Sequence, residues 1–262
     1  MISVDRKKLR VTFFGASYKI AQAINRIFTL QNIVCEERHF NLDLFNYAMN
    51  CQISFWTVQK RSDLVNTTIF SDDFAISYGT GIIFKSIDIY RFKHGIWNIH
   101  PGKLPENRGR HPISWSFLDN DRHFTVTIHL INSEIDQGYI LGEANIQRDL
   151  HDSQAEIIQK IESLLEGAFL TQAADAYFFG ERRPLEQGRY RERMDGKYST
   201  INSIDVDSSM LFNLFKCQQS FGGVTLNGRP RTQCHFVNSD FLDLYKAYEL
   251  VTCRDGKIMA VI

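Results

Sequence analysis

Residues 96–105 read Ile-Trp-Asn-Ile-His-Pro-Gly-Lys-Leu-Pro, and this stretch organises the rest of the chain. Side chains point alternately to the two faces of a β-strand, so a strand that ends here places Asn98 and His100 on one face. Pro101 favours an extended conformation at His100, and the Pro-Gly pair then turns the chain. We therefore expect a strand end at which an amide and an imidazole point the same way.

A second strand-like run, residues 124–131, leads into a loop, residues 132–138, that contains the acids Glu134 and Asp136. If the two strands pair, a loop acid can approach the imidazole of His100. An amide, an imidazole and a carboxylate without a Ser or Cys nucleophile suit acyl transfer that forms no covalent intermediate. The structural alternative is a strand-end histidine, a turn-capping asparagine and an ordinary Asp-Gln-Gly turn.

Composition limits the class of protein. The chain has 262 residues, enough for one full core and a smaller second unit. Its basic and acidic residues number 30 each, so no net field attracts tRNA or an anionic membrane, and we expect a small-molecule partner. The sequence shows neither an apolar run of bilayer length nor a signal-peptide pattern, which predicts a cytoplasmic protein.

Cysteine and histidine usage argues against a metal. The five cysteines are scattered and never form a Cys-x-x-Cys pair, so we expect neither a disulfide nor a zinc site. A metal hydrolase built on His94, His100 and His111 would lack a His-x-x-x-His helix and would lose activity to chelators. We expect no metal.

Strands alternate with helices through the first half of the chain. The pattern predicts strands at 9–14, 33–37, 53–58 and 74–78 and helices at 19–30 and 42–49. This order is typical of an α/β fold with an open, mostly parallel sheet flanked by helices, whose ligands bind at the carboxyl ends of the strands. The G-x-G-x-x-G spacing of a dinucleotide site is absent.

The second half predicts a helix from Pro112 and a single long amphipathic helix over residues 153–178. A Gly-Glu-Arg-Arg-Pro run at 180–184 then marks a boundary, which gives a catalytic domain at 1–180 and a small region at 181–262 for nucleotide binding and dimerisation. That region should hold a helix at 208–218 and a hairpin at 221–232 with an Asn-Gly turn.

Three motifs occur in order: Asn98-Ile99-His100-Pro101, Leu104-Pro105-Glu106-Asn107-Arg108-Gly109 and Asp136-Gln137-Gly138. With Pro112, Trp115 and Thr127-Ile128-His129, they closely resemble the N10-formyltetrahydrofolate-dependent formyltransferases, strongly over about residues 70–145 and weakly over the flanks. The resemblance implies a formyltransferase-type Rossmann-like domain with the catalytic triad Asn98, His100 and Asp136. In such enzymes an amine attacks the formyl carbon, and the amide and imidazole stabilise the oxyanion.

The resemblance also implies two binding sites. The folate site would lie between the loop after Tyr78 and the loop from Ile131, and would use Tyr78, Ile82, Phe84, Leu104, Ile131 and Glu134. The acceptor site would use Ser17 at a helix start, Arg108, Tyr190 and Arg193 in a basic aromatic run, Lys216, and Phe221 as a face on which a pyrimidine stacks. The alternative for Ser17 is an ordinary β-α turn, and the alternative for the charged residues is that they are simply solvated. The alternative for Phe221 is a core phenylalanine at the base of the hairpin.

The helix and hairpin of the tail look like those of nucleotide-sugar N-formyltransferases, which formylate an aminosugar carried on dTDP or a related nucleotide. The resemblance implies dTDP-4-amino-4,6-dideoxyglucose as the best guess for the acceptor. It also implies a role in O-antigen and lipopolysaccharide biosynthesis and a homodimer. A formyltetrahydrofolate hydrolase and a methionyl-tRNA formyltransferase remain alternatives, although the neutral charge speaks against tRNA. The 3-amino and 4-amino sugars are not distinguished.

Overall fold

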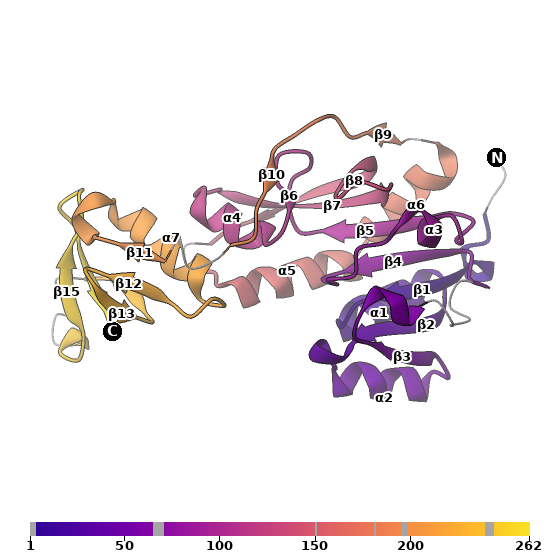
Figure 1. Cartoon of the computed structure of the whole chain (residues 1–262), viewed down its shortest axis with the longest axis horizontal. Helices are drawn as coiled ribbons and strands as arrows, with labels where there is room; N and C mark the ends of the chain where they lie inside the picture. The colour runs from indigo at the N-terminus through magenta and orange to yellow at the C-terminus, as the bar shows by residue number, and fades with distance from the viewer. Residues whose placement is uncertain (1–3, 65–70, 150, 181, 195–198, 239–243) are drawn as a thin grey trace. The chain divides into compact units, whose positions relative to one another are not determined.

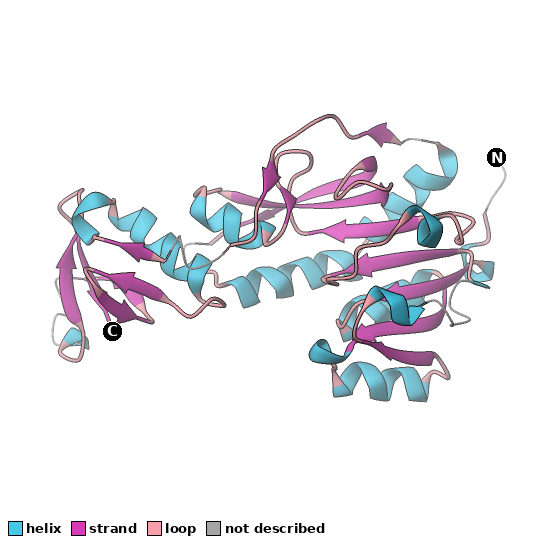
Figure 2. Ribbon diagram, in the orientation of Figure 1, coloured by secondary structure: helices cyan, strands magenta, loops and turns pink. Residues whose placement is uncertain are grey.

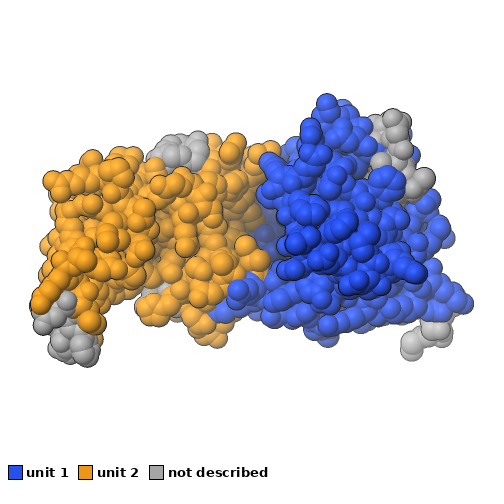
Figure 3. Space-filling view, turned by 90° about the horizontal axis from the view of Figure 1, so that it is seen from below, with its two compact units in different colours: residues 1–108, 125–146, 159–189 blue, residues 109–124, 147–158, 190–262 orange. Residues whose placement is uncertain are grey.

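The computed structural model describes residues 4–64, 71–149, 151–180, 182–194, 199–238 and 244–262 (Figure 1). The chain divides into two units (Figure 3). Unit 1 comprises residues 1–108, 125–146 and 159–189, and unit 2 comprises residues 109–124, 147–158 and 190–262. Both units are assembled from separate stretches of the chain, whereas the sequence-based division at residue 180 cuts the chain once and stays a prediction.

Unit 1 contains nearly all of an eight-stranded sheet, whose strands are magenta in Figure 2. The strand order is β3-β2-β1-β4-β5-β7-β8-β9, with the labels of Figure 1. The strands are β1 Arg10–Phe14, β2 Thr29–Glu36, β3 Ser54–Val58, β4 Phe74–Tyr78, β5 Ile96–His100, β7 His123–Ile131, β8 Gly138–Gln147 and β9 Arg183–Pro184. The first five strands in this order, β3, β2, β1, β4 and β5, run parallel to one another. β7 pairs with β5 in the antiparallel direction. The mostly parallel α/β sheet expected from the sequence is confirmed.

The helices of unit 1 begin where the sequence supplies caps. α1 Tyr18–Ile27 starts at Ser17, whose side chain accepts from the backbone N–H of Ile20, and α2 Leu42–Asn50 starts at Asn41, which accepts from Leu44. The short α3 Ser86–Ile89 follows the loop after β4. The central strands β1 and β4 are almost entirely buried, as parallel strands covered on both faces require.

One expectation for the second half is wrong. Residues 153–178 do not form one helix, because the chain breaks into α5 Gln154–Glu166 and α6 Phe169–Phe179 at Gly167. Glycine is among the weakest helix formers, and here the amide of Gly167 donates to the Leu164 carbonyl in a tighter turn, at 3.3 Å. β8 and α3 were not predicted at all.

Unit 2 packs α7 Ser208–Gln218 against α4 Pro112–Leu118. The predicted hairpin is present as β12 Val224–Leu226 and β13 Arg229–Arg231, with positive φ at both turn residues, 50° at Asn227 and 78° at Gly228. Its other strands are β10 Tyr190–Arg191, which pairs with β6 Arg108–Gly109, β11 Thr200–Ile201, β14 Cys234–Phe236, β15 Glu249–Thr252 and β16 Ile258–Val261. Apolar side chains of α7, including Leu211 and Leu214, form the core with Val224 and Met259.

No helix in the described ranges combines the length and the apolarity needed to cross a bilayer.

Candidate active site

Asn98 stands in a row of three polar side chains on adjacent strands. β4 places Ser77 beside it and β7 places His129 on its other side, because the register pairs Ser77 with Asn98 and Asn98 with His129. The Ser77 hydroxyl lies 2.8 Å from Asn98 Oδ1, and Asn98 Nδ2 lies 3.2 Å from His129 Nε2. Strand register alone therefore holds the amide at both of its polar atoms.

His100 ends β5 and is buried. Its Nε2 lies 2.7 Å from the backbone carbonyl oxygen of Asn107, and its Nδ1 lies 3.7 Å from Oδ1 of Asp136. A carbonyl only accepts, so the ring carries its proton on Nε2. In its neutral form this ring would present an unprotonated Nδ1 towards Asp136, and that nitrogen would be the one able to take a proton.

His129 was quoted in the sequence motif but not assigned a role, and the structure adds it to this cluster. Its side chain is fully buried, with Nε2 3.9 Å from Asp136 Oδ1. Burial lowers the pKa of His129 to about 4, although the charge of Asp136 acts in the opposite direction. The imidazole therefore stays neutral near pH 7. Strand alternation through Thr127-Ile128-His129, combined with the predicted strand pairing, could have found it.

The loop that carries Asp136 is fixed from two sides. The Arg108 side chain donates from Nε and Nη2 to the Ile135 carbonyl, at 3.2 and 2.8 Å, and Asn132 Oδ1 accepts from the amide of Glu134 at 2.9 Å. Asp136 has a φ of 49°, a left-handed conformation that needs such support. The described side-chain hydrogen bonds of Arg108, which was expected in the acceptor site, are therefore with this loop.

The residues expected to contact folate lie around the ends of β4 and β7. Tyr78 and Leu104 are buried, and the side chains of Ile82 and Phe84 belong to an apolar cluster against which Ile131 packs. The loop after β4 is held by Glu36, whose Oε2 accepts from the Gly81 amide at 2.7 Å. Ile82 and Phe84 therefore pack with their side chains, and it is their backbone groups that could bind a ligand. Glu134 is exposed.

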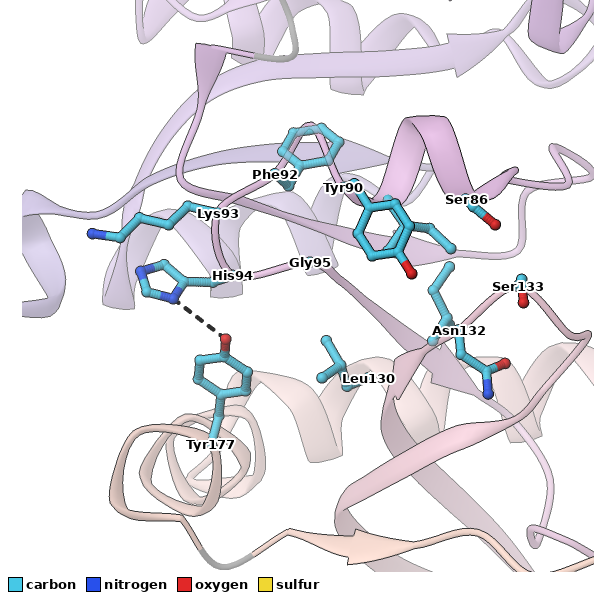
Figure 4. Close-up of a pocket in the computed structure, with 12 residues that line it drawn as sticks. Ser86, Tyr90, Phe92, Lys93, His94, Gly95, Leu130, Asn132, Ser133 and Tyr177 are labelled. Carbon is cyan, nitrogen blue, oxygen red and sulfur yellow. Dashed lines mark hydrogen bonds between the residues drawn. The ribbon is translucent and has the colours of Figure 1, made fainter.

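A cavity of about 300 Å³ lies next to this region (Figure 4). It is lined by Ser86, Ile89, Tyr90, Phe92, Lys93, His94, Gly95, Leu130, Ile131, Asn132, Ser133 and Tyr177. The Tyr177 hydroxyl and His94 Nδ1 are 3.3 Å apart at one side of it. Ile131 is the residue that the cavity shares with the expected folate set.

Ser17, the expected phosphate contact, is already engaged. Besides capping α1, its hydroxyl donates to Glu162 Oε1 at 2.7 Å, and Lys19 Nζ lies 3.6 Å from the other carboxylate oxygen. A carboxylate thus occupies the positive end of the helix, where a phosphate would otherwise be favoured. Glu162 was not singled out from the sequence.

The remaining expected acceptor residues belong to unit 2, where they fall into two groups. Phe221 and His111 are ring neighbours with centroids 4.7 Å apart, and the charge of the exposed Arg193 reinforces burial in lowering the pKa of His111. Lys216 instead donates from Nζ to the His151 carbonyl at 3.0 Å and lies 5.1 Å from the centroid of the Phe212 ring.

Tyr190, the other expected acceptor residue of unit 2, has no described contact with either of these two groups. Tyr190 is exposed on β10, next to the buried Arg191. Among the residues that the structure describes, no group of three or more His, Cys, Asp or Glu side chains is arranged to hold a metal ion.

Comparison with known proteins shows which proteins this part of the chain resembles. Residues 70–173 match the family model described as formyl transferase. The methionyl-tRNA formyltransferase of Finegoldia magna is 29% identical over 150 residues, which cover 55% of this chain and 47% of that protein. The chain thus spans about half the length of the curated relatives it matches. Residues 70–173 are thus similar to a formyl transferase domain.

Solved structures agree with the fold over almost the whole chain. The sugar 3-N-formyltransferase WlaRD, solved in the presence of dTDP and 5-N-formyl-THF, has a TM-score of 0.69 at 16% identity, with 97% of each chain covered. An N-formyltransferase from Helicobacter canadensis, solved with folinic acid and dTDP-3-aminofucose, has a TM-score of 0.70 at 15% identity and covers 97% of this chain and 98% of its own. At these identities the likeness is one of fold.

Proposed function

We propose that the protein is an N-formyltransferase that moves a formyl group from N10-formyltetrahydrofolate to the amino group of a nucleotide-linked dideoxy aminosugar. The observation that carries the proposal is the cluster of Asn98, His100 and Asp136 at one strand end within a region similar to a formyl transferase domain. The cluster combines an amide donor, a histidine nitrogen able to take a proton and a carboxylate. These are the groups that direct transfer to an amine requires.

The geometry suggests how the steps divide. The amine nitrogen attacks the formyl carbon, and an N–H of Asn98 stabilises the negative charge that develops on the formyl oxygen. His100 takes the amine proton at Nδ1, since Nε2–H is bound to the Asn107 carbonyl, and the carboxylate of Asp136 stabilises the resulting imidazolium. The bond between the formyl carbon and N10 then breaks, and the proton held on Nδ1 passes to N10.

The folate would bind beside the loops of Phe84 and Ile131. The apolar cluster of their side chains supports these loops, and the backbone groups of Ile82 and Glu134 offer donors and acceptors to the edge of a flat pterin. Tyr78 and Leu104 are both buried, so we propose that they act from beneath the site by supporting its loops. The similar structures were solved with folate compounds, which supports a folate co-substrate here.

A nucleotide sugar is the acceptor that we favour. The chain covers nearly the full length of two enzymes whose solved forms contain dTDP or a dTDP-sugar, and its net charge is zero, which gives tRNA no attractive field. The fold is also similar to that of a 4-N-formyltransferase from Francisella tularensis, with a TM-score of 0.62, so both the 3-amino and the 4-amino sugar are acceptors to test. We further propose dTDP-4-amino-4,6-dideoxyglucose as the first acceptor to test, a cytoplasmic homodimer, and a role in O-antigen or lipopolysaccharide biosynthesis.

The test is a turnover assay with N10-formyltetrahydrofolate against dTDP-4-amino-4,6-dideoxyglucose, its 3-amino isomer, UDP- and GDP-aminosugars, methionyl-tRNA and water. Transfer to one nucleotide sugar supports the proposal and assigns the amine position. Formate release with water as the acceptor would make the protein a hydrolase, and transfer to methionyl-tRNA would replace the acceptor class. Failure to consume the formyl donor with any acceptor would reject the activity.

A further inference from the structure

Ser77 is a buried hydroxyl that the proposed reaction does not use, yet it contacts the amide that the reaction depends on. It is 1% exposed and sits on β4 directly beside Asn98 of β5. Its Oγ lies 2.8 Å from Asn98 Oδ1 and 3.5 Å from the Trp97 carbonyl oxygen. Asn98 Oδ1 is therefore the nearer of the two acceptors for the Ser77 hydroxyl.

A side-chain amide can bind in two orientations that exchange its oxygen and its NH₂ group. When Ser77 donates to Oδ1, Nδ2 lies at 3.2 Å from His129 Nε2, which must accept. A buried, neutral imidazole has one accepting nitrogen, and burial lowers the pKa of His129 to about 4, so the ring is available in that form. In this arrangement Ser77 donates to Oδ1 and a His129 ring protonated on Nδ1 accepts from Nδ2, so both neighbours are paired with the amide in one orientation.

This orientation determines where the remaining donor lies. Asp136 Oδ1 is 3.9 Å from His129 Nε2 and 3.7 Å from His100 Nδ1, so Nδ2 lies on the side of Asn98 that faces the acid and the imidazoles. One Nδ2–H bonds His129 and the other is left for a ligand. The reversed amide would turn its oxygen towards that side, where it would repel a developing oxyanion.

We infer that Ser77 and His129 are positioning residues that fix the amide of Asn98 with Nδ2 towards the reacting formyl group. The inference rests on the proposed formyl transfer. It assigns to Ser77 an effect on the transition state rather than on binding, because the formyl oxygen becomes a strong acceptor only when the amine attacks.

The kinetic test compares Ser77→Ala with Ser77→Thr. We expect Ser77→Ala to lower kcat about 10-fold while both KM values stay within about twofold, because one orienting hydrogen bond is lost. Ser77→Thr keeps the hydroxyl on a β-strand and should return kcat to within about threefold of the wild type. In an Asn98→Ala background Ser77→Ala should change kcat by less than about twofold, since no amide remains to be oriented. Full kcat in Ser77→Ala, or an equal loss in both backgrounds, overturns the inference.

A second measurement does not need turnover. Nitrogen-15 spectra of histidine-labelled protein report which ring nitrogen of His129 carries the proton, with His129→Gln used to assign its signals. We expect Nε2 unprotonated, as an acceptor for Asn98. A proton on Nε2 would mean that the amide is reversed and would reject the inference. If the wild-type enzyme transfers no formyl group, the proposed function fails, and these spectra still decide the orientation.

Discussion

The polar residues of unit 1 and the cations and rings of unit 2 are held in different ways. In unit 1, Ser77, Asn98 and His129 lie side by side on three strands, so main-chain pairing sets their distances. In unit 2, Lys216 lies in the last turn of α7 and Phe221 follows that helix, and each already contacts a neighbour of its own. The side chains that strand register positions in unit 1 form one cluster that can react. The side chains that turns and helix ends position in unit 2 also take part in local packing.

The largest expected effect tests whether the strand-borne cluster acts on catalysis alone. Asn98→Ala removes the oxyanion donor and should lower kcat roughly 10²- to 10³-fold, and His100→Ala should lower it by a similar factor by removing the proton acceptor. Steady-state kinetics of formyl transfer measure both. Because Asn98 also pairs with the buried Ser77 and His129, thermal unfolding of each variant is measured alongside to separate lost turnover from lost folding. A variant with undiminished kcat would end the assignment of that residue.

The next prediction tests whether a cation of unit 2 is structural. Arg191 is 6% exposed, forms an ion pair with Asp119 and lies 4.9 Å from the centroid of the Trp115 ring. Arg191→Ala should lower the free energy of unfolding by about 2 kcal/mol or more, because it removes a buried partner and a cation-π contact. Urea denaturation measures this loss.

A matched control for Arg191 is available in the same unit. Arg254 pairs with Asp207 at the surface, where the side chains are 61% and 44% exposed, so Arg254→Ala should leave the free energy of unfolding nearly unchanged. If Arg191→Ala instead keeps full stability and raises the acceptor KM, the cation binds ligand and the contrast between the two units fails.

The buried imidazole of His129 should make the unfolding of unit 1 depend on pH. Its pKa is about 4 in the folded protein against an ordinary value of 6.5, so the unfolded chain binds the extra proton. Stability is therefore complete above pH 6.5 and is lost as the pH falls towards 4, by roughly 3 kcal/mol in full. We expect His129→Gln to flatten the dependence on pH over that range. Urea titrations at pH 7, 5.5 and 4 would show parallel losses in both proteins if the idea is wrong.

Sequence reasoning succeeded where a local pattern also determines a distance. Alternation placed Asn98 and His100 on one face, and the pairing of β5 with β7 then brought the loop of Asp136 within 3.7 Å of the imidazole. The contacts of Ser77 and Glu162 could not be predicted, because neither the register of β4 against β5 nor the approach of Glu162 to the start of α1 follows from a local pattern. The break at Gly167 was missed because an apolar period continues through it, although the glycine was visible.

An aromatic of unit 2 provides a smaller test of acceptor binding. If Phe221 stacks on a nucleotide base, Phe221→Ala should raise the KM of the acceptor about 10-fold and leave the KM of the formyl donor unchanged. Phe221→Tyr keeps the ring face and serves as the control. An equal KM in Phe221→Ala, combined with lower stability, would assign the ring to packing against His111 and would complete the contrast with unit 1.

The smallest effect concerns Arg108, whose cation acts on the active cluster through the main chain. Two hydrogen bonds to the Ile135 carbonyl hold the residue before Asp136, and their loss is worth about 1 kcal/mol, or roughly a fivefold fall in kcat. Arg108→Lys, which lacks the two-pronged guanidinium, should fall between the wild type and Arg108→Ala. Arg110, exposed two residues along, gives the matched control, and Arg110→Ala should keep full kcat. If Arg108→Ala raises the acceptor KM and leaves kcat unchanged, Arg108 binds substrate, and its hydrogen bonds to the Asp136 loop do not control turnover.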